Sequence, residues 1–188
     1  MTQRRVRVDA QRNMDALLGA ALTVFMSSGV DAPAKEIADL AGVGVGTLYR
    51  HFPQRSDLIV AVLEHEIDAV AERAPALVAD HEPAAALREW FRAYVELLAT
   101  KPGFASALHS GDPAYAALPG YFLRRLGPAL QTLLDHAADG IRSDVGAEDL
   151  LHAVALLCQS VSGQGRAYTD RMVGVLLDGL TRESKGKP

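Results

Sequence analysis

Polar side chains that can donate hydrogen bonds follow one another closely between residues 47 and 51. Thr47, Tyr49, Arg50 and His51 carry a hydroxyl, a phenol, a guanidinium and an imidazole, and phosphate oxygens accept hydrogen bonds from all of these groups. Val45, just before them, offers only methyl groups, which suit the methyl group of a thymine base. These residue types favour contact with a nucleic-acid duplex over burial in a protein core.

Two glycines, Gly44 and Gly46, stand beside these residues. Without a Cβ atom, each allows the backbone to approach a DNA groove closely. Glycine is a poor helix former, and the pair costs roughly 1–2 kcal/mol of helix propensity. We expect a close approach to DNA to offset this cost.

Two short helices joined at Gly42 must position these side chains. Ile37, Leu40 and Ala41 have the i, i+3, i+4 spacing that gives a helix one apolar face. Gly42 follows where a left-handed helix stop is required, a conformation that glycine adopts at little cost. A second helix is predicted over Val45–His51, and a helix–turn–helix of this size presents its second helix to the DNA major groove.

The turn, the second helix and the basic residue that follows it match, position by position, the pattern of one family. This part of the chain resembles the DNA-binding domain of the tetracycline-repressor (TetR) family. The chain departs from the family at Gly44, where a serine or another polar residue is frequent, and at Pro33-Ala34, where Thr or Ser is frequent. The departure at Gly44 removes a phosphate donor, and neither departure disturbs the fold. The resemblance covers about residues 10–60 and rests on Gly29, Glu36-Ile37-Ala38, Ala41-Gly42-Val43, Gly46-Thr47-Leu48-Tyr49, His51-Phe52, Arg55 and Leu58.

Further contacts with DNA are predicted outside the helix-turn-helix itself. Lys35 matches a family position that reaches phosphate or a base, the alternative being a solvated lysine. Arg55 and the first-turn N–H groups of the helix that begins near it are expected to bind phosphate. Residues 1–8 are predicted to form a mobile basic arm that lies along phosphates or enters a minor groove, with a solvated terminus as an equal alternative. The predicted DNA contacts are Lys35, Gly44, Val45, Thr47, Tyr49, Arg50, His51, Arg55, Arg4, Arg5 and Arg7.

Composition predicts an all-α chain. Of the 188 residues 49% are hydrophobic and 6% aromatic, and the alternating pattern of strands is missing. We expect about nine helices: an N-terminal three-helix helix-turn-helix domain over residues 1–64, then a helical effector-binding and dimerisation domain over residues 65–188 with a flexible tail at 182–188. Apolar periodicity predicts helices over Ala10–Ser28, Pro83–Lys101, Phe104–His109, Leu118–Ala138, Ala147–Ser162 and Arg166–Leu180.

Charge is distributed unevenly along the chain, whose formal net charge is −4. Residues 1–55 have a net charge of +2 and the remainder −6, a pattern that fits a protein touching phosphate with one face only. The single cysteine, Cys158, excludes an internal disulfide and favours a cytoplasmic location. No apolar run approaches the roughly 18 residues that a membrane span requires, so no membrane-spanning segment is expected.

Aromatic residues concentrate in the middle helices. The resemblance implies an effector pocket there, and an ordinary helical core is the alternative. The expected effector contacts are Trp90, Tyr94, Phe104, His109 and Phe122.

The last two predicted helices are apolar around more of their circumference than one small domain needs. This surplus predicts a self-complementary four-helix interface with a second copy of the chain. Its expected residues are Leu151, Val154, Cys158, Val161, Met172, Leu176 and Leu180.

The predicted function is that of a homodimeric repressor that binds a palindromic operator in double-stranded DNA and is released by a small-molecule effector of unknown identity. No cofactor or metal is expected. A DNA-binding regulator or architectural protein without an effector is the first alternative. A helical enzyme is less favoured, because no His-x-x-Glu-His, phosphate-binding glycine loop or Cys-x-x-Cys is present, and Cys158 lies among apolar residues, as a buried structural thiol does.

Overall fold

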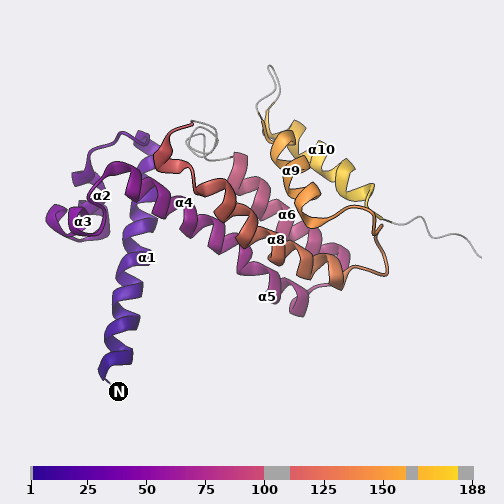
Figure 1. The fold of residues 1–188 in the computed structure, drawn as a ribbon, viewed down its shortest axis with the longest axis horizontal. Coiled ribbons are helices and arrows are strands. Elements are labelled where there is room, and N and C mark those ends of the chain that lie inside the picture. Colours follow the sequence, from indigo (N-terminus) through magenta and orange to yellow (C-terminus); the bar gives the residue numbers. More distant parts are fainter. Residues whose placement is uncertain (1, 100–110, 160–164, 182–188) are drawn as a thin grey trace, which may run out of the picture. The chain divides into compact units, whose positions relative to one another are not determined.

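The computed structural model describes the backbone of residues 2–99, 111–159 and 165–181 and the side chains of residues 12–98, 111–159 and 165–181. These residues form helices joined by turns, without a strand (Figure 1), so the predicted all-α fold is confirmed. The predicted helix Phe104–His109 and the tail 182–188 lie outside the described residues. The helices are α1 (Thr2–Ser28), α2 (Ala34–Ala41), α3 (Val45–His51), α4 (Arg55–Ala71), α5 (Arg73–Asp80), α6 (Pro83–Ala99), a 3-10 helix (Pro113–Tyr115), α8 (Leu118–His136), α9 (Ala147–Leu157) and α10 (Arg166–Asp178).

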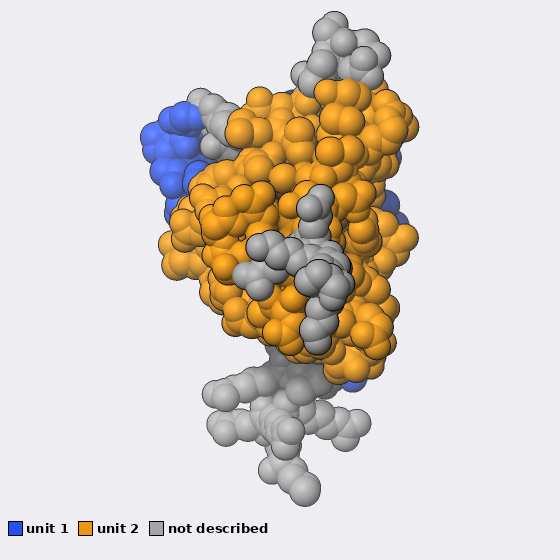
Figure 2. Space-filling model, turned by 90° about the vertical axis from the view of Figure 1, so that its right-hand side faces the viewer, with its two compact units in different colours: residues 1–66, 103–119 blue, residues 67–102, 120–188 orange. Residues whose placement is uncertain are grey.

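The chain divides into two compact units, coloured separately in Figure 2. Unit 1 comprises residues 1–66 and 103–119, and unit 2 comprises residues 67–102 and 120–188. Helix α4 therefore begins in unit 1 and ends in unit 2. The predicted first domain, residues 1–64, did not include the segment 103–119.

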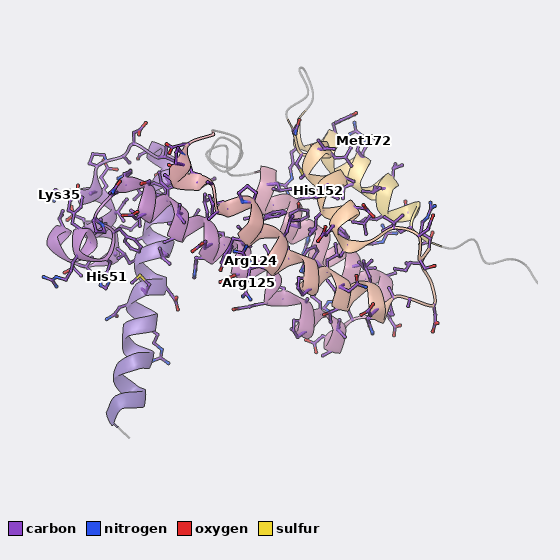
Figure 3. The ribbon with its side chains drawn as sticks, viewed as in Figure 1. Lys35, His51, Arg124, Arg125, His152 and Met172 are labelled. Carbon is purple, nitrogen blue, oxygen red and sulfur yellow. The ribbon has the colours of Figure 1, made fainter. Side chains whose placement is uncertain are left out.

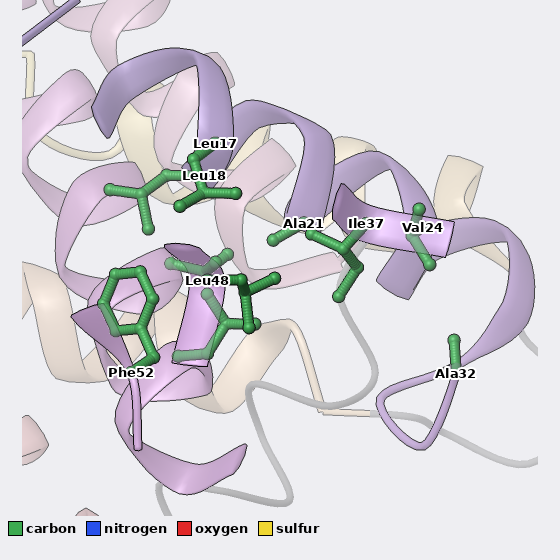
Figure 4. Close-up of a cluster of buried hydrophobic side chains, with 10 residues drawn as sticks. Leu17, Leu18, Ala21, Val24, Ala32, Ile37, Leu48 and Phe52 are labelled. Carbon is green, nitrogen blue, oxygen red and sulfur yellow. The ribbon is translucent and has the colours of Figure 1, made fainter. Parts of the chain in front are cut away.

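Unit 1 is built around an apolar cluster to which α1, α2, α3 and the first part of α4 all contribute (Figure 4). Ile37 is 0% exposed, Leu58 1% and Leu48 2%. Burying an aliphatic side chain of this size stabilises a fold by about 1.5–3 kcal/mol, so these residues fix how α2 and α3 pack on α1. The cluster consists of Leu17, Leu18, Ala21, Val24, Ala32, Ile37, Leu48, Phe52, Leu58 and Val62.

The start of α1 differs from the prediction. The helix begins at Thr2 rather than Ala10, so the mobile arm predicted for residues 1–8 was wrong for the backbone of residues 2–8. Glutamine and arginine form helices well, and an existing helix extends one residue at a time without a new nucleation step. Periodicity could not reveal these eight residues, because their two apolar members, Val6 and Val8, do not recur at three- or four-residue steps.

Unit 2 is organised around α6, which contacts α5, α9 and α10. Two ion pairs join α6 to α10: Arg88 to Asp178 (2.6 Å) and Arg166 to Glu96 (2.7 Å). Over the described ranges, no helix combines the length and apolar character that crossing a bilayer requires. The core of unit 2 includes Leu87, Trp90, Phe91, Tyr94, Leu126, Leu130, Leu133, Leu150, Leu151, Val154, Val173 and Leu177.

Candidate nucleic-acid interface

The turn between α2 and α3 is fixed by glycine. Gly42 has φ 69° and ψ 28°, in the left-handed region. The N–H of Gly42 donates to the carbonyl of Asp39 (3.2 Å), and that of Val43 donates to the carbonyl of Ala38 (3.0 Å). This paired arrangement is a Schellman motif, which satisfies the last carbonyls of α2 and turns the chain sharply. The predicted glycine stop is confirmed.

Helix α3 has one buried side and one side turned to solvent. Leu48 is 2% exposed and Phe52, which follows the helix, 9% exposed, and their i, i+4 spacing places both on the face toward the core. Tyr49 is 53% exposed, and Arg50 and His51 are exposed as well. Three hydrogen-bonding side chains on a helix anchored from behind form a surface that can meet phosphate groups.

The first turn of α3 is open. Gly44 is its N-cap residue in an extended conformation, with no side chain to cap the helix. Val45 and Thr47 are half-buried and Gly46 is exposed. Apart from its chain neighbours and the backbone of α3, no heavy atom of the described residues lies within 4 Å of the place where a Cβ atom of residue 46 would stand, so packing does not require glycine there.

Lys35 lies on the exposed side of α2. Its Nζ is 2.6 Å from a carboxylate oxygen of Asp39, and the two side chains are 74% and 63% exposed. A solvent-exposed i, i+4 pair contributes only about 0.3–0.5 kcal/mol, so the ammonium can leave Asp39 for a phosphate at little cost. Figure 3 labels Lys35 and His51 beside α2 and α3.

Arg55 is placed differently from the other predicted contacts. Its side chain is half-buried and is directed at Val30 and Phe25 rather than at solvent. The N–H of Gln54, at the start of α4, donates to the carboxylate of Asp57 (2.9 Å). The side chains of Arg4, Arg5 and Arg7 lie outside the described residues.

Of the predicted effector contacts, Trp90, Tyr94 and Phe122 are brought together in unit 2. The rings of Trp90 and Tyr94 stack at 5.7 Å, and those of Tyr94 and Phe122 are also 5.7 Å apart. Trp90 and Tyr94 are 0% exposed; Trp90 Nε1 donates to Val70 (3.0 Å) and the Tyr94 hydroxyl to Leu151 (2.9 Å). Burial, and secondarily Cys158, raises the pKa of Tyr94. Both residues are therefore satisfied core residues in this structure, and Phe104 and His109 lie outside the described residues.

The predicted dimer residues divide by burial. Leu151, Val154 and Leu180 are 0%, 0% and 5% exposed, so their side chains pack inside a single chain. Cys158, Met172 and Leu176 are half-buried, and Val161 lies outside the described residues. Figure 3 labels Met172 on α10.

Two other large apolar side chains are exposed on α9 and α10: Leu156 is 65% exposed and Val175 64%. Neither was among the dimer residues predicted from the sequence. Each lies about 120–180° around the helix axis from its buried neighbours, but the sequence alone does not tell which of the two faces is buried.

Cys158 is not placed for nucleophilic chemistry. Burial raises the pKa of its thiol to about 11, with Arg166 lowering it and Asp170 raising it to smaller extents, so the reactive thiolate is scarce near neutral pH. The part of the chain that the structure describes also holds no group of three or more His, Cys, Asp or Glu side chains arranged for a metal ion.

Comparison with known proteins agrees with this geometry. A family model described as "Bacterial regulatory proteins, tetR family" matches residues 17–62, which contain α2, the Gly42 turn and α3. A second, described as "Transcriptional regulator SbtR-like, C-terminal domain", matches residues 82–182, more than half of the chain. The chain belongs to the TetR family of transcriptional regulators. Members of this family are DNA-binding regulators rather than enzymes.

Solved TetR structures extend the likeness over nearly the whole chain. A TetR regulator from Streptomyces coelicolor is 37% identical, covers 90% of this chain and 99% of its own, and superposes with a TM-score of 0.73. A TetR regulator from Mycobacterium vanbaalenii is 32% identical, covers 94% and 99%, and has a TM-score of 0.69. A helix-turn-helix regulator from Staphylococcus aureus is 38% identical over 69 residues, 35% of this chain and 36% of its own length. The match to such curated relatives thus spans about a third of their length.

Proposed function

We propose that this TetR protein is a homodimeric transcriptional repressor, acting in the cytoplasm, that binds a palindromic operator and is released from it by a small molecule. The observation that carries the DNA-binding part is the geometry of α3. Leu48 and Phe52 anchor it, while Tyr49, Arg50 and His51 are exposed together on its outer side.

In this proposal the exposed side of α3 binds phosphates, and Lys35 adds a further phosphate contact by leaving Asp39. Gly46 lets the backbone approach the groove, and Val45 contacts a thymine methyl group. Gly44 and Val45 offer no side-chain hydrogen bonds to bases, so specificity rests on Lys35, Thr47 and the sequence-dependent shape of the DNA.

The second copy docks on the outer faces of α9 and α10, where Leu156 and Val175 are exposed, with Cys158, Met172 and Leu176 at their edges. A self-complementary interface of this kind relates the two copies by a two-fold axis. The two α3 helices then lie about 34–36 Å apart, matching successive major grooves on one side of the duplex.

The effector acts, in this proposal, on the aromatic group of Trp90, Tyr94 and Phe122. Trp90 donates to the main chain of Val70 in α4, so a ligand that displaces α6 also displaces the helix leading back to the DNA-binding residues. A ligand shifts the equilibrium only by binding the two states with different affinity. The full burial of Trp90 and Tyr94 favours a second candidate, a regulator without a small-molecule effector.

The proposed function is tested by selecting binding sites for the full-length protein from a random 30-bp duplex library. We expect a palindromic consensus, a dimer in light scattering, and an affinity that falls steeply with salt. Arg50→Met is expected to reduce the slope of log K against log salt by about 1.8, because the dimer loses two phosphate contacts and each contributes about 0.9. Binding without sequence preference, or without salt dependence, would contradict the proposal.

The effector part has a separate test. The chain contains one tryptophan, so its fluorescence reports on Trp90 alone. Apolar small molecules are titrated into the protein, and each one that changes the emission is added to the operator complex. Release of DNA supports the repressor, whereas a panel that changes neither emission nor DNA affinity favours the regulator without an effector.

A further inference from the structure

The guanidinium of Arg55 is turned toward the protein. Its Nε donates to the carbonyl of Val30 at 2.7 Å. Its central carbon lies 5.0 Å from the centre of the Phe25 ring, within the distance at which a cation is attracted to an aromatic face. Its Nη2 is buried and has no hydrogen-bond partner among the described residues. Two of the three guanidinium nitrogens are thus directed away from solvent.

These contacts enclose the helix-turn-helix. Val30 precedes α2 and Arg55 follows α3, so a hydrogen bond between residues 25 positions apart closes a loop of chain that contains both helices. Phe25 lies in the last turns of α1 and packs against the apolar cluster of unit 1. Arg55 therefore ties the first turn of α4 to the end of α1 and to the segment that enters α2.

The start of α4 is also poorly suited to a phosphate. The Asp57 carboxylate already accepts a hydrogen bond from the Gln54 N–H, at 2.9 Å. An acidic side chain at a helix N-terminus uses the free N–H groups and the helix dipole that would otherwise attract an anion. Its negative charge repels a phosphate at the same place.

We infer that Arg55 is a positioning residue for DNA binding and not a phosphate ligand. It holds α2 and α3 at the orientation in which the exposed side of α3 meets the duplex, through Val30 and Phe25. This inference rests on the proposed DNA-binding function, because the effect is measured on operator affinity.

The test compares Arg55→Lys, Arg55→Met and Phe25→Leu in the full-length protein. The probe is the duplex that the wild-type protein selects from the random 30-bp library. Affinity is measured from low to high salt, at a temperature where circular dichroism shows every variant folded. Arg50→Met is the control for a lost phosphate contact.

We expect all three variants to bind about tenfold more weakly, because a charge-assisted hydrogen bond or the cation–aromatic contact is lost in each. For these variants the salt slope differs from the wild-type value by less than about 0.3. The control Arg50→Met lowers it by about 1.8, since the dimer loses two phosphate contacts. Phe25→Leu is the decisive variant, since it removes no charge. A double variant, Phe25→Leu with Arg55→Met, binds little worse than either single variant, because both remove the same contact.

Three results would overturn the inference. In the first, Arg55→Lys binds as the wild type does, and Arg55→Met lowers the salt slope by about 1.8, as the loss of one phosphate ligand from each copy requires. In the second, Phe25→Leu leaves the affinity unchanged. In the third, the variants melt at lower temperature but the folded proteins bind normally, which indicates a role in stability alone. Failure of the wild type to select any duplex would instead contradict the proposed function itself.

Discussion

The substitution Gly46→Ala tests why the seven-residue helix α3 has a poor helix former as its second residue. Gly46 is the second residue of α3, and it is exposed. Apart from its chain neighbours and its own helix backbone, no heavy atom in the described part of the chain lies within 4 Å of the position that its Cβ atom would occupy, and its φ is outside the left-handed region. An alanine therefore fits the free protein without a clash or backbone strain.

The two effects of this substitution have opposite signs. Replacing glycine by alanine in a compatible helical position stabilises a protein by about 0.4–1 kcal/mol, because the unfolded chain loses conformational freedom. If the backbone at residue 46 approaches the DNA closely, the added methyl group pushes α3 out of the groove. Losing one good base or phosphate contact costs about 1–3 kcal/mol, so the operator affinity falls between about fivefold and 150-fold.

Urea unfolding followed by circular dichroism measures the stability, and fluorescence anisotropy with the selected operator measures the affinity. Gly19→Ala is the matched control: Gly19 lies in the interior of α1, and again no described heavy atom beyond its chain neighbours and its own helix backbone lies within 4 Å of the place that a Cβ atom would take. It should show the gain in stability with wild-type DNA binding. If Gly46→Ala binds the operator as tightly as the wild type does, close approach is not the reason for glycine at this position.

Three further predictions concern other parts of the chain. Gly44→Ser supplies the missing N-cap side chain of α3 and should stabilise the protein by a few tenths of a kcal/mol, with tighter operator binding by anisotropy if the hydroxyl also reaches a phosphate. Leu156→Glu and Val175→Glu change side chains that are 65% and 64% exposed, and each should give a monomer in light scattering. The free energy of unfolding of the single chain should not change. Ala138→Glu, at another exposed position, is the control and should stay dimeric. Since the pKa of Cys158 is raised to about 11, only about 0.1% of the thiol is ionised at pH 8. The rate of alkylation by iodoacetamide, followed by mass spectrometry, should therefore keep rising up to about pH 11. A rate profile with its midpoint near pH 9 would contradict this.

The helix-turn-helix was predictable because its determinants are local. The glycine stop, the apolar spacing of α2 and the anchoring pair Leu48 and Phe52 all lie within sixteen consecutive residues. The bounds of α3, Val45–His51, agree with the sequence prediction. Local signals failed at the start of α1, where helix propensity extends the element beyond its apolar stripe.

Burial in unit 2 was harder to predict because apolar residues occupy opposite faces of α9. Leu151 is fully buried and Leu156 is 65% exposed, although the two have the same side chain. Periodicity identifies the residues that share a face. It does not tell which face packs against α6 of the same chain and which is left for a partner, since that depends on helices distant in sequence.

Arg55 shows the same difficulty at a charged residue. It matches the basic position of the family motif, and a guanidinium at the start of a helix is equally compatible with a phosphate and with a carbonyl beside an aromatic ring. Its partners, Phe25 and Val30, lie 30 and 25 positions earlier in the chain, so the choice depends on how α1 and α4 pack. A residue of a DNA-binding motif can therefore be required for binding without touching DNA. Removing its aromatic partner, which carries no charge, separates the two roles because only a positioning residue depends on that ring.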